Sequence, residues 1–296
     1  MNRARWVGLL ALFIAAHAGA QTSVVLLGTG VPRPDPLASG PATAVVVGTR
    51  TFLFDAGAGV EHQLASAHLP INGVTALFVT HLHSDHTLGL PDLIFTTWLM
   101  GRTKPMQAYG PHGLGSMVDH ILAAWSEDIA VRVNGLEHEV AHGYDVKVHE
   151  ISPGVVYDSA GVKVTAIPVL HGDWKDAYAY RIDAPGRSIL ISGDTRTSPA
   201  LIAAARGIDI LIHEVYPESK LAPEDRPGGG DWPQYMRAFH TSDIELGRLA
   251  AEAKPRLLIL YHVVKRLGAT DDDLIAAVHR GGYTGRVVVG KDLERY

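Results

Sequence analysis

Three histidines and an aspartate lie within residues 81–86 (HLHSDH), one position after the apolar run 74–79. An apolar, β-branched run of this length is typical of a buried strand, so these side chains follow the C-terminal end of that strand. Buried imidazoles and carboxylates are costly unless they are paired or bind a metal. A tight loop would direct the first two histidines at one ion, and the aspartate and the last histidine at a second.

Similar polar side chains follow other apolar runs of the chain. They are His171 after 165–170, Asp194 after 189–191, Glu214 after 210–212 and His262 after 257–261. Strand ends at one edge of a sheet sandwich converge in space, so we expect a two-metal site there. Its predicted ligands are His81, His83 and His171 on one ion, Asp85, His86 and His262 on the other, and Asp194 as the bridge.

The ligand types indicate which metals and which chemistry to expect. The chain has no cysteine, and imidazole with carboxylate suits zinc, with manganese or iron as alternatives. Two such divalent ions side by side activate a water molecule as the nucleophile, which predicts a hydrolase. The remaining histidines lack this placement and are expected at the surface or in packing, namely His62, His68, His112, His120, His138, His142, His149 and His279.

The N-terminal residues 1–20 have the plan of a secretory signal peptide. Arg3 and Arg5 precede an apolar run, and small residues lie at the expected cleavage site before Gln21. We therefore expect a periplasmic or secreted protein without stable membrane association after cleavage, with an uncleaved anchor as the alternative. The absence of cysteine excludes a disulfide framework and a lipoprotein attachment site.

The charge balance argues against nucleic acid as a partner. The chain has 26 basic and 31 acidic side chains, and removal of residues 1–20, with two arginines and no acid, moves the net charge from −5 to −7. Affinity for nucleic acid depends on clustered Lys and Arg that neutralise phosphates, and the sequence shows no such cluster.

The pattern of strands and helices predicts one domain over residues 21–296, without an internal linker. Strands and helices alternate as far as residue 125. Short strands then follow at 144–151, 154–158, 162–169, 179–182 and 188–191, and we expect them to form a second, partly antiparallel sheet. Helices at 199–206, 242–253 and 270–279 alternate with strands at 208–212, 257–261 and 286–289. The fold class is α/β, a four-layer αββα sandwich.

Several segments are candidates for supporting the metals or shaping the substrate. Asp55 opens a glycine-rich loop, which either supports the metal site by hydrogen bonds or is a plain strand-to-helix turn. Residues 216–239 are rich in Pro and Gly and form either a lid with aromatic faces at Trp232 and Tyr235 or an ordinary surface loop. Further candidates for the mouth of the site are Trp98, Trp125 and Trp174, with Lys175 and Arg196 to steer an anion.

The ordered motifs resemble those of the metallo-β-lactamase superfamily over the whole chain after residue 20. The resemblance rests on His-x-His-x-Asp-His, His171-Gly172, Ser192-Gly193-Asp194-Thr195 and His262. It implies the αββα fold and a metal-dependent hydrolase. An aspartate at position 194 and the lack of cysteine differ from the true β-lactamases and argue against antibiotic hydrolysis.

Within the superfamily, the chain resembles the ribonuclease Z and arylsulfatase branch. The segments 213–216 (HEVY) and 240–242 (HTS) are similar to two loops of ribonuclease Z. The resemblance implies that Glu214 and His240 form a proton relay in which the imidazole protonates a leaving alkoxide. Asp85, Glu214 and His240 are therefore the predicted catalytic residues.

The predicted function is that of a phosphodiesterase acting on a small ester. Ribonuclease Z proteins commonly carry a tRNA-binding arm between the third histidine motif and the bridging aspartate, whereas only 172–193 lie between them here. The alternatives are an alkyl or aryl sulfatase, a lactonase, and a metal-binding protein with little turnover. The resemblance also allows a homodimer.

Overall fold

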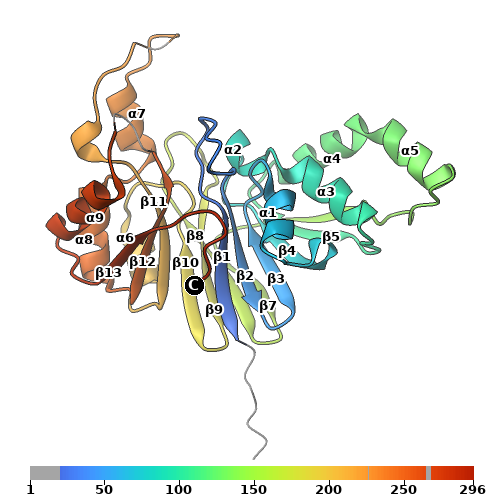
Figure 1. Ribbon diagram of the computed structural model, residues 1–296, viewed down its shortest axis with the longest axis horizontal. Coiled ribbons are helices and arrows are strands. Elements are labelled where there is room, and N and C mark those ends of the chain that lie inside the picture. The colour runs from blue at the N-terminus through green and yellow to red at the C-terminus, as the bar shows by residue number, and fades with distance from the viewer. Residues whose placement is uncertain (1–20, 226, 265–267) are drawn as a thin grey trace, which may run out of the picture.

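The computed structural model describes residues 21–225, 227–264 and 268–296 (Figure 1). The predicted signal peptide, residues 1–20, lies outside them. Among the described residues, no helix combines the length and the apolar character needed to cross a membrane.

The first sheet has six strands, and their order across the sheet follows the chain. They are β1 (Thr22–Gly28), β2 (Ala42–Val47), β3 (Arg50–Phe54), β4 (Val74–Phe78), β5 (Met106–Gly110) and β6 (Val146–Glu150). The outer face is covered by α1 (Val60–Ser66), α3 (Leu90–Leu99) and α4 (Leu114–Ala124), with the short turn η1 (Ile71–Gly73) before β4 and α5 (Ser126–Asn134) extending beyond the sheet (Figure 1).

The second sheet has seven strands in the order β13, β12, β11, β10, β9, β8, β7. They are β7 (Gly154–Ser159), β8 (Val162–Pro168), β9 (Tyr178–Ala184), β10 (Arg187–Ile191), β11 (Ile210–Val215), β12 (Leu257–Val263) and β13 (Arg286–Val289). Its outer face packs against α6 (Pro199–Ala205), α8 (Asp243–Ala253) and α9 (Asp271–Arg280). The turn η2 (Glu218–Lys220) and α7 (Trp232–Phe239) lie between β11 and α8.

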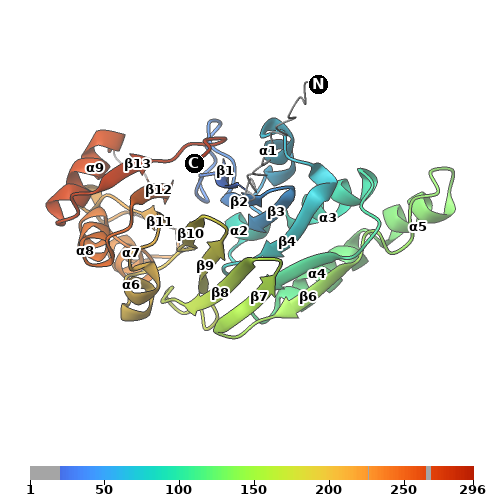
Figure 2. The same cartoon turned by 90° about the horizontal axis from the view of Figure 1, so that it is seen from below.

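The inner faces of the two sheets bury a common apolar core (Figure 2). Strand β8 shows why, because Val162, Val164 and Ala166 alternate with more exposed residues and point into this core. Aromatic rings link the sheets, since Phe54 and Phe78 of the first sheet pack on Tyr180 of the second at ring distances of 5.7 and 5.6 Å. The predicted single-domain αββα sandwich is confirmed.

The structure corrects several predicted elements. The strand predicted at 144–151 is β6, which pairs in parallel with β5 and belongs to the first sheet, so its assignment to the second sheet is wrong. The chain reaches this position through α5, a helix that the sequence analysis missed and none of whose side chains is buried. Strands β11 and β12 extend to Val215 and Val263, so Glu214 and His262 lie inside the strand ends.

The C-terminal residues join the two sheets at the edge strand β1. After the chain leaves β13 of the second sheet at Val289, Tyr296 exchanges backbone hydrogen bonds of 2.9 Å with Val24. The Asp292 carboxylate accepts hydrogen bonds from the backbone N–H groups of Thr29 (2.9 Å) and Ser39 (2.7 Å) and from the Gln63 side chain (2.6 Å). One acid therefore connects the C-terminus with the loop after β1 and with α1.

Replacement of Asp292 tests this connection. Asp292→Ala leaves several half-buried donors without their charged acceptor, and we expect a loss of about 2–3 kcal/mol in the free energy of unfolding. Chemical unfolding followed by circular dichroism measures the loss, and Asp158→Ala, at an exposed position of β7, is the control. Equal stabilities of the two variants would show that the carboxylate does not hold this corner.

Candidate metal centre

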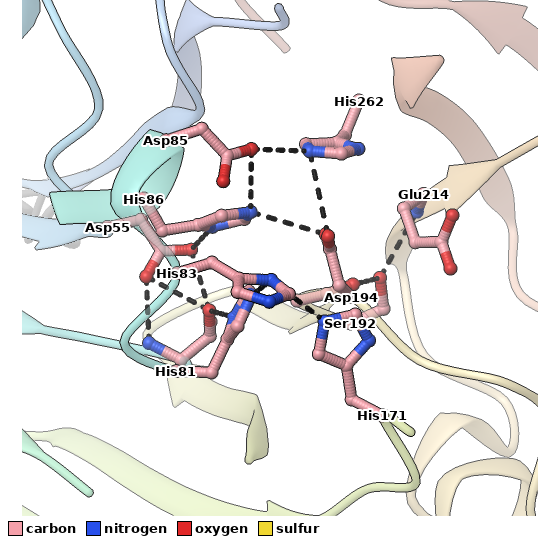
Figure 3. Close-up of polar contacts among 12 residues, drawn as sticks. Asp55, His81, His83, Asp85, His86, His171, Ser192, Asp194, Glu214 and His262 are labelled. Atoms are coloured by element: carbon pink, nitrogen blue, oxygen red, sulfur yellow. Dashed lines mark hydrogen bonds and ion pairs between the residues drawn. The ribbon is translucent and has the colours of Figure 1, made fainter. Parts of the chain in front are cut away.

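All seven predicted metal ligands meet at one edge of the sandwich (Figure 3). The first motif follows β4 and continues into the short helix α2 (Ser84–Thr87) rather than forming a plain loop. The other ligands follow or end strands of the second sheet. They form two groups: His81, His83, His171 and Asp194, and Asp85, His86 and His262.

Three imidazole nitrogens face one another in the first group. His83 Nδ1 lies 3.0 Å from His81 Nε2 and 3.1 Å from His171 Nε2. An oxygen of Asp194 lies within 4.8 Å of these nitrogens. The arrangement presents three ring nitrogens and one carboxylate to a single point, as a metal requires.

The second group faces Asp194 from the opposite side. His86 Nε2 lies 3.3 Å from Asp194 Oδ1 and 3.6 Å from Asp85 Oδ2. His262 Nε2 lies 3.2 Å from Asp85 Oδ2 and 3.7 Å from Asp194 Oδ2. Asp194 thus contacts both groups, which is the position predicted for the bridging ligand.

Contacts behind the rings fix the proton positions of three histidines. The Nδ1 of His171 donates to the Phe239 carbonyl oxygen (2.8 Å) and the Nδ1 of His86 donates to Asp55 (2.8 Å). Thr80 Oγ1 donates to Asp55 and is thereby left to accept from His81 Nδ1 (3.0 Å). With the proton on Nδ1, each ring turns the lone pair of its Nε2 toward the centre. Asp55 is accordingly placed to support the ligands, one of its two predicted roles.

His83 differs from these three because its outer nitrogen meets a donor. The indole N–H of Trp174 points at His83 Nε2 at 2.8 Å. An indole nitrogen only donates, so the His83 proton lies on Nδ1 in this geometry. A neutral imidazole has a single N–H, so a metal bound at Nδ1 would require that proton on Nε2, and the Trp174 N–H would then have to leave this contact.

Unusual backbone angles direct two of the side chains. Asp55 and His262 have φ values of 60° and 44°, in the left-handed region that residues other than glycine rarely adopt. His262 lies at an irregularity in the pairing of β11 with β12, between the pairs Glu214 with Tyr261 and Val215 with Val263. Such a bulge turns a strand side chain to a new direction, here toward Asp85 and Asp194.

The electrostatics prepare the first group for a cation, whereas a metal in the second group would displace a proton from His86. Burial lowers the pKa of His86, but Asp194 and Asp55 outweigh it and raise that pKa well above its usual range. Burial lowers the pKa of His83 and His171 to about 4 and that of His81 well below its usual range, so these rings are neutral at pH 7. Burial raises the pKa of Asp194, but His262 and His86 outweigh it and hold the carboxyl ionised. Among the described residues, the buried atoms His86 Nε2 and Asp194 Oδ1 have no hydrogen-bond partner. Divalent metal ions fit this donor set.

The two residues of the predicted relay lie beside this centre. Glu214 Oε1 accepts hydrogen bonds from the backbone N–H groups of Thr195 (3.2 Å) and Thr241 (3.0 Å), which fixes its carboxylate. His240 Nδ1 lies 3.4 Å from the same oxygen and 3.9 Å from Asp194 Oδ2. Burial lowers the pKa of His240, but the Glu214 carboxylate outweighs it and raises the pKa above its usual value.

Helix α7 positions both a ligand and the relay. Its last residue, Phe239, supplies the carbonyl that holds His171, and His240 follows directly. The Phe239 ring packs where a Cβ of Gly172 would lie, and Gly172 has φ 54°, so position 172 requires glycine. The sequence analysis treated this segment as a loop. The helix is signalled by the Asp231 cap, which accepts from Gln234 N, and by proline in its first turn.

The surroundings of the centre include residues that were predicted and others that were not. A cavity of about 540 Å³ opens over the ligands and is lined in part by Arg33, Trp232, Tyr235 and Met236. Met236 belongs to the predicted lid segment 216–239, whereas Arg33 was not predicted, because no local motif marks it. Trp98 belongs to α3 and is buried against the first sheet, and Trp125 packs on Phe95 of the same helix at a ring distance of 5.4 Å, so neither lies at the mouth.

Comparisons with known proteins agree with this geometry. The family described as "Beta-lactamase superfamily domain" matches residues 50–263. A ribonuclease Z of Mycobacterium marinum is 33% identical over 92% of this chain and 97% of its own length.

Solved structures share the fold. The metallo-β-lactamase fold protein YhfI from Bacillus subtilis superposes with a TM-score of 0.71 at 19% identity, covering 93% of this chain and 98% of its own. The short form of human tRNase Z superposes with a TM-score of 0.69 at 23% identity, with the same coverage. With its sequence relatives, its fold and its clustered histidines and aspartates, the chain belongs to the metallo-β-lactamase superfamily and is a metal-dependent hydrolase of ester bonds that resembles ribonuclease Z.

Proposed function

We propose that the protein is an exported phosphodiesterase that uses two divalent metal ions to hydrolyse a small diester with an aromatic substituent. Zinc is the first candidate for these ions. The observation that carries this proposal is the position of Asp194 between two groups of ligands, with His240 3.9 Å from its carboxylate. Export rests on the pattern of residues 1–20 alone. A monomer or a homodimer would be equally compatible with this chemistry.

The residues divide the chemistry among themselves. Metal ions held by the two groups would supply an activated water and neutralise charge on the phosphoryl oxygens. Asp85, itself one of the predicted ligands, lines the cavity and is placed to accept the proton of that water as the new P–O bond forms. His240 donates a proton to the oxygen that leaves as the old P–O bond breaks, and Glu214 stabilises the imidazolium before the transfer.

The cavity favours a small diester. Its volume of about 540 Å³ is that of an ordinary small-molecule site. Trp232 and Tyr235 stack on each other at 5.3 Å and line it together, which offers an aromatic surface to a ring. Arg33 lines the same cavity and matches the single negative charge of a phosphodiester.

The charges around the site argue against a long polyanion. Lys175 lines a neighbouring hollow together with Asp173 and Asp176. Arg196 lines the next one together with Asp173 and Asp231. Each of these two basic side chains is thus offset by acidic ones, whereas a nucleic-acid binding surface needs clustered positive charge.

RNA processing is the second candidate. The relatives named ribonuclease Z match the chain over nearly their whole length, which favours the same reaction on a transfer-RNA precursor.

A comparison of substrates decides between these candidates. We expect metal-loaded protein to hydrolyse bis(p-nitrophenyl) phosphate, and His83→Ala and chelator-treated protein to be inactive because they lack the ions. The parallel substrates are p-nitrophenyl sulfate, an acyl lactone and a transfer-RNA precursor. Faster turnover of the sulfate would support the sulfatase, and preference for the precursor would support RNA processing. Full activity of His83→Ala would contradict the metal mechanism itself.

The leaving group reveals the role of His240. We expect His240→Ala to retain its metal but to lose about 10²–10⁴-fold in rate on diesters with poorly leaving alkoxides, because these need a proton. The loss should be small for p-nitrophenolate, which leaves without one. The measurement is the rate on a series of diesters of graded leaving-group pKa, with metal content determined in parallel. It gives the dependence of the rate on leaving-group pKa for the variant and the wild type. An equal loss across the series would contradict the acid role.

The aromatic surface is tested by Trp232. Trp232→Ala should raise KM for bis(p-nitrophenyl) phosphate by about tenfold, since one stacked ring contributes about 1–1.5 kcal/mol. KM for methyl p-nitrophenyl phosphate, with one ring fewer, should rise less. Trp125→Ala, at a half-exposed tryptophan outside the cavity lining, is the control. Unchanged KM for both diesters would exclude a role of Trp232 in binding.

A further inference from the structure

A second group of metal-ligand side chains lies outside the catalytic centre, between α1 and α3. It consists of Glu61 and His62 in the first turn of α1 and Asp92 near the start of α3. One carboxylate oxygen of each acid and one ring nitrogen of His62 lie within 4.8 Å of one another. The proposed hydrolysis uses none of these residues.

The environment of Glu61 sets this group apart from an ordinary acidic surface. Its side chain is only 4% exposed, and within the described ranges neither of its carboxylate oxygens has a hydrogen-bond partner. Burial and the adjacent Asp92 carboxyl raise the pKa of Glu61 to about 9. A buried acid that lacks a donor and faces a second acid is costly unless a proton or a cation lies between them.

The neighbouring contacts leave the group ready to bind an ion. Thr96 Oγ1 donates to Asp92 Oδ1 at 2.6 Å, which orients that carboxylate. His62 and Asp92 are exposed, so an ion can reach the group from solvent while Glu61 closes it from the inside. Leu64 and Leu93 are fully buried behind it and fix the two helices against the first sheet.

We propose that Glu61, His62 and Asp92 form a third metal site, which takes a divalent ion of the zinc or manganese type. Two carboxylates and one imidazole suit these ions better than calcium or magnesium, which prefer ligand sets made of oxygen. Solvent completes the coordination at the exposed side. The site is independent of the proposed function, because none of its ligands contributes to the catalytic centre.

The third ion would stiffen the support of the catalytic ligands. The loop that carries Asp55 leads into α1, and α2, which carries His86, leads into α3. These two connections already bond to each other, since Ala56 N donates to His86 O and Gly89 N donates to Ala56 O, both at 2.9 Å. An ion bound by both α1 and α3 would link the same two segments a second time, about one helical turn beyond these backbone hydrogen bonds.

Metal content tests the site directly. Metal-free protein is equilibrated with Zn²⁺, freed of unbound ion by gel filtration and analysed by mass spectrometry. We expect Glu61→Gln, His62→Ala and Asp92→Asn each to hold one zinc fewer per chain than the wild type. Glu127→Gln, the same change in the first turn of α5, should hold as many as the wild type. A chain carrying His83→Ala, Asp85→Ala and Asp194→Ala, which breaks both groups of the catalytic centre, should still bind one zinc.

A stability measurement shows whether Glu61 and Asp92 share a metal ion or only a proton. The folded pKa of Glu61, about 9, exceeds its unfolded value of 4.5, so this carboxyl costs stability increasingly as pH rises between the two. Metal-free Glu61→Gln should therefore unfold at a higher temperature than the wild type at pH 8, and zinc should reverse that order. Equal zinc contents and an unreversed order would overturn the proposal and assign a shared proton to Glu61 and Asp92.

Discussion

The convergence of buried lone pairs is the constraint on which this structure depends. His83 Nδ1 lies 3.0 Å from His81 Nε2 and 3.1 Å from His171 Nε2, and the buried Asp194 carboxylate faces the three rings. Such a cluster is unfavourable without a cation. Its ligands come from both sheets, because His81 to His86 follow β4, and His171, Asp194 and His262 belong to the second sheet. The centre can therefore form only when the sandwich closes, which links metal binding to folding.

The ligands alone do not hold this geometry. Asp55 holds His86 and Thr80, Thr80 in turn holds His81, and the Phe239 carbonyl holds His171. Each contact fixes a proton on the outer nitrogen and so keeps the inner nitrogen free for a metal. The Phe239 contact comes from α7, which also carries Trp232 and Tyr235 into the cavity. A substrate that moves α7 would thus act on His171 and His240 at the same time.

The sequence predicted what depends on local pattern. Residues 81–86, His171, Asp194 and His262 could be found because apolar runs place them at strand ends, and the structure brings them together. The sequence could not assign β6 to the correct sheet, since the run 146–150 has the same pattern whether it pairs with β5 or with β7. Helix α5 was missed because none of its side chains is buried, and α7 was missed because it is only 8 residues long and follows a stretch rich in Pro and Gly. Arg33 reaches the cavity from the loop after β1, a contact between distant parts of the chain.

The substrate is decided outside the ligand set. The proposed two-metal centre, with an acid beside it, would suit phosphate and sulfate esters alike, so the ligands do not distinguish between them. The distinction has to come from the cavity wall, where α7 and the loop after β1 supply one cation and two stacked rings. A singly charged diester satisfies that cation and leaves its ring for the aromatic surface. A polynucleotide would also have to pass Asp173, Asp176 and Asp231, whose charges oppose each phosphate that Lys175 or Arg196 attracts.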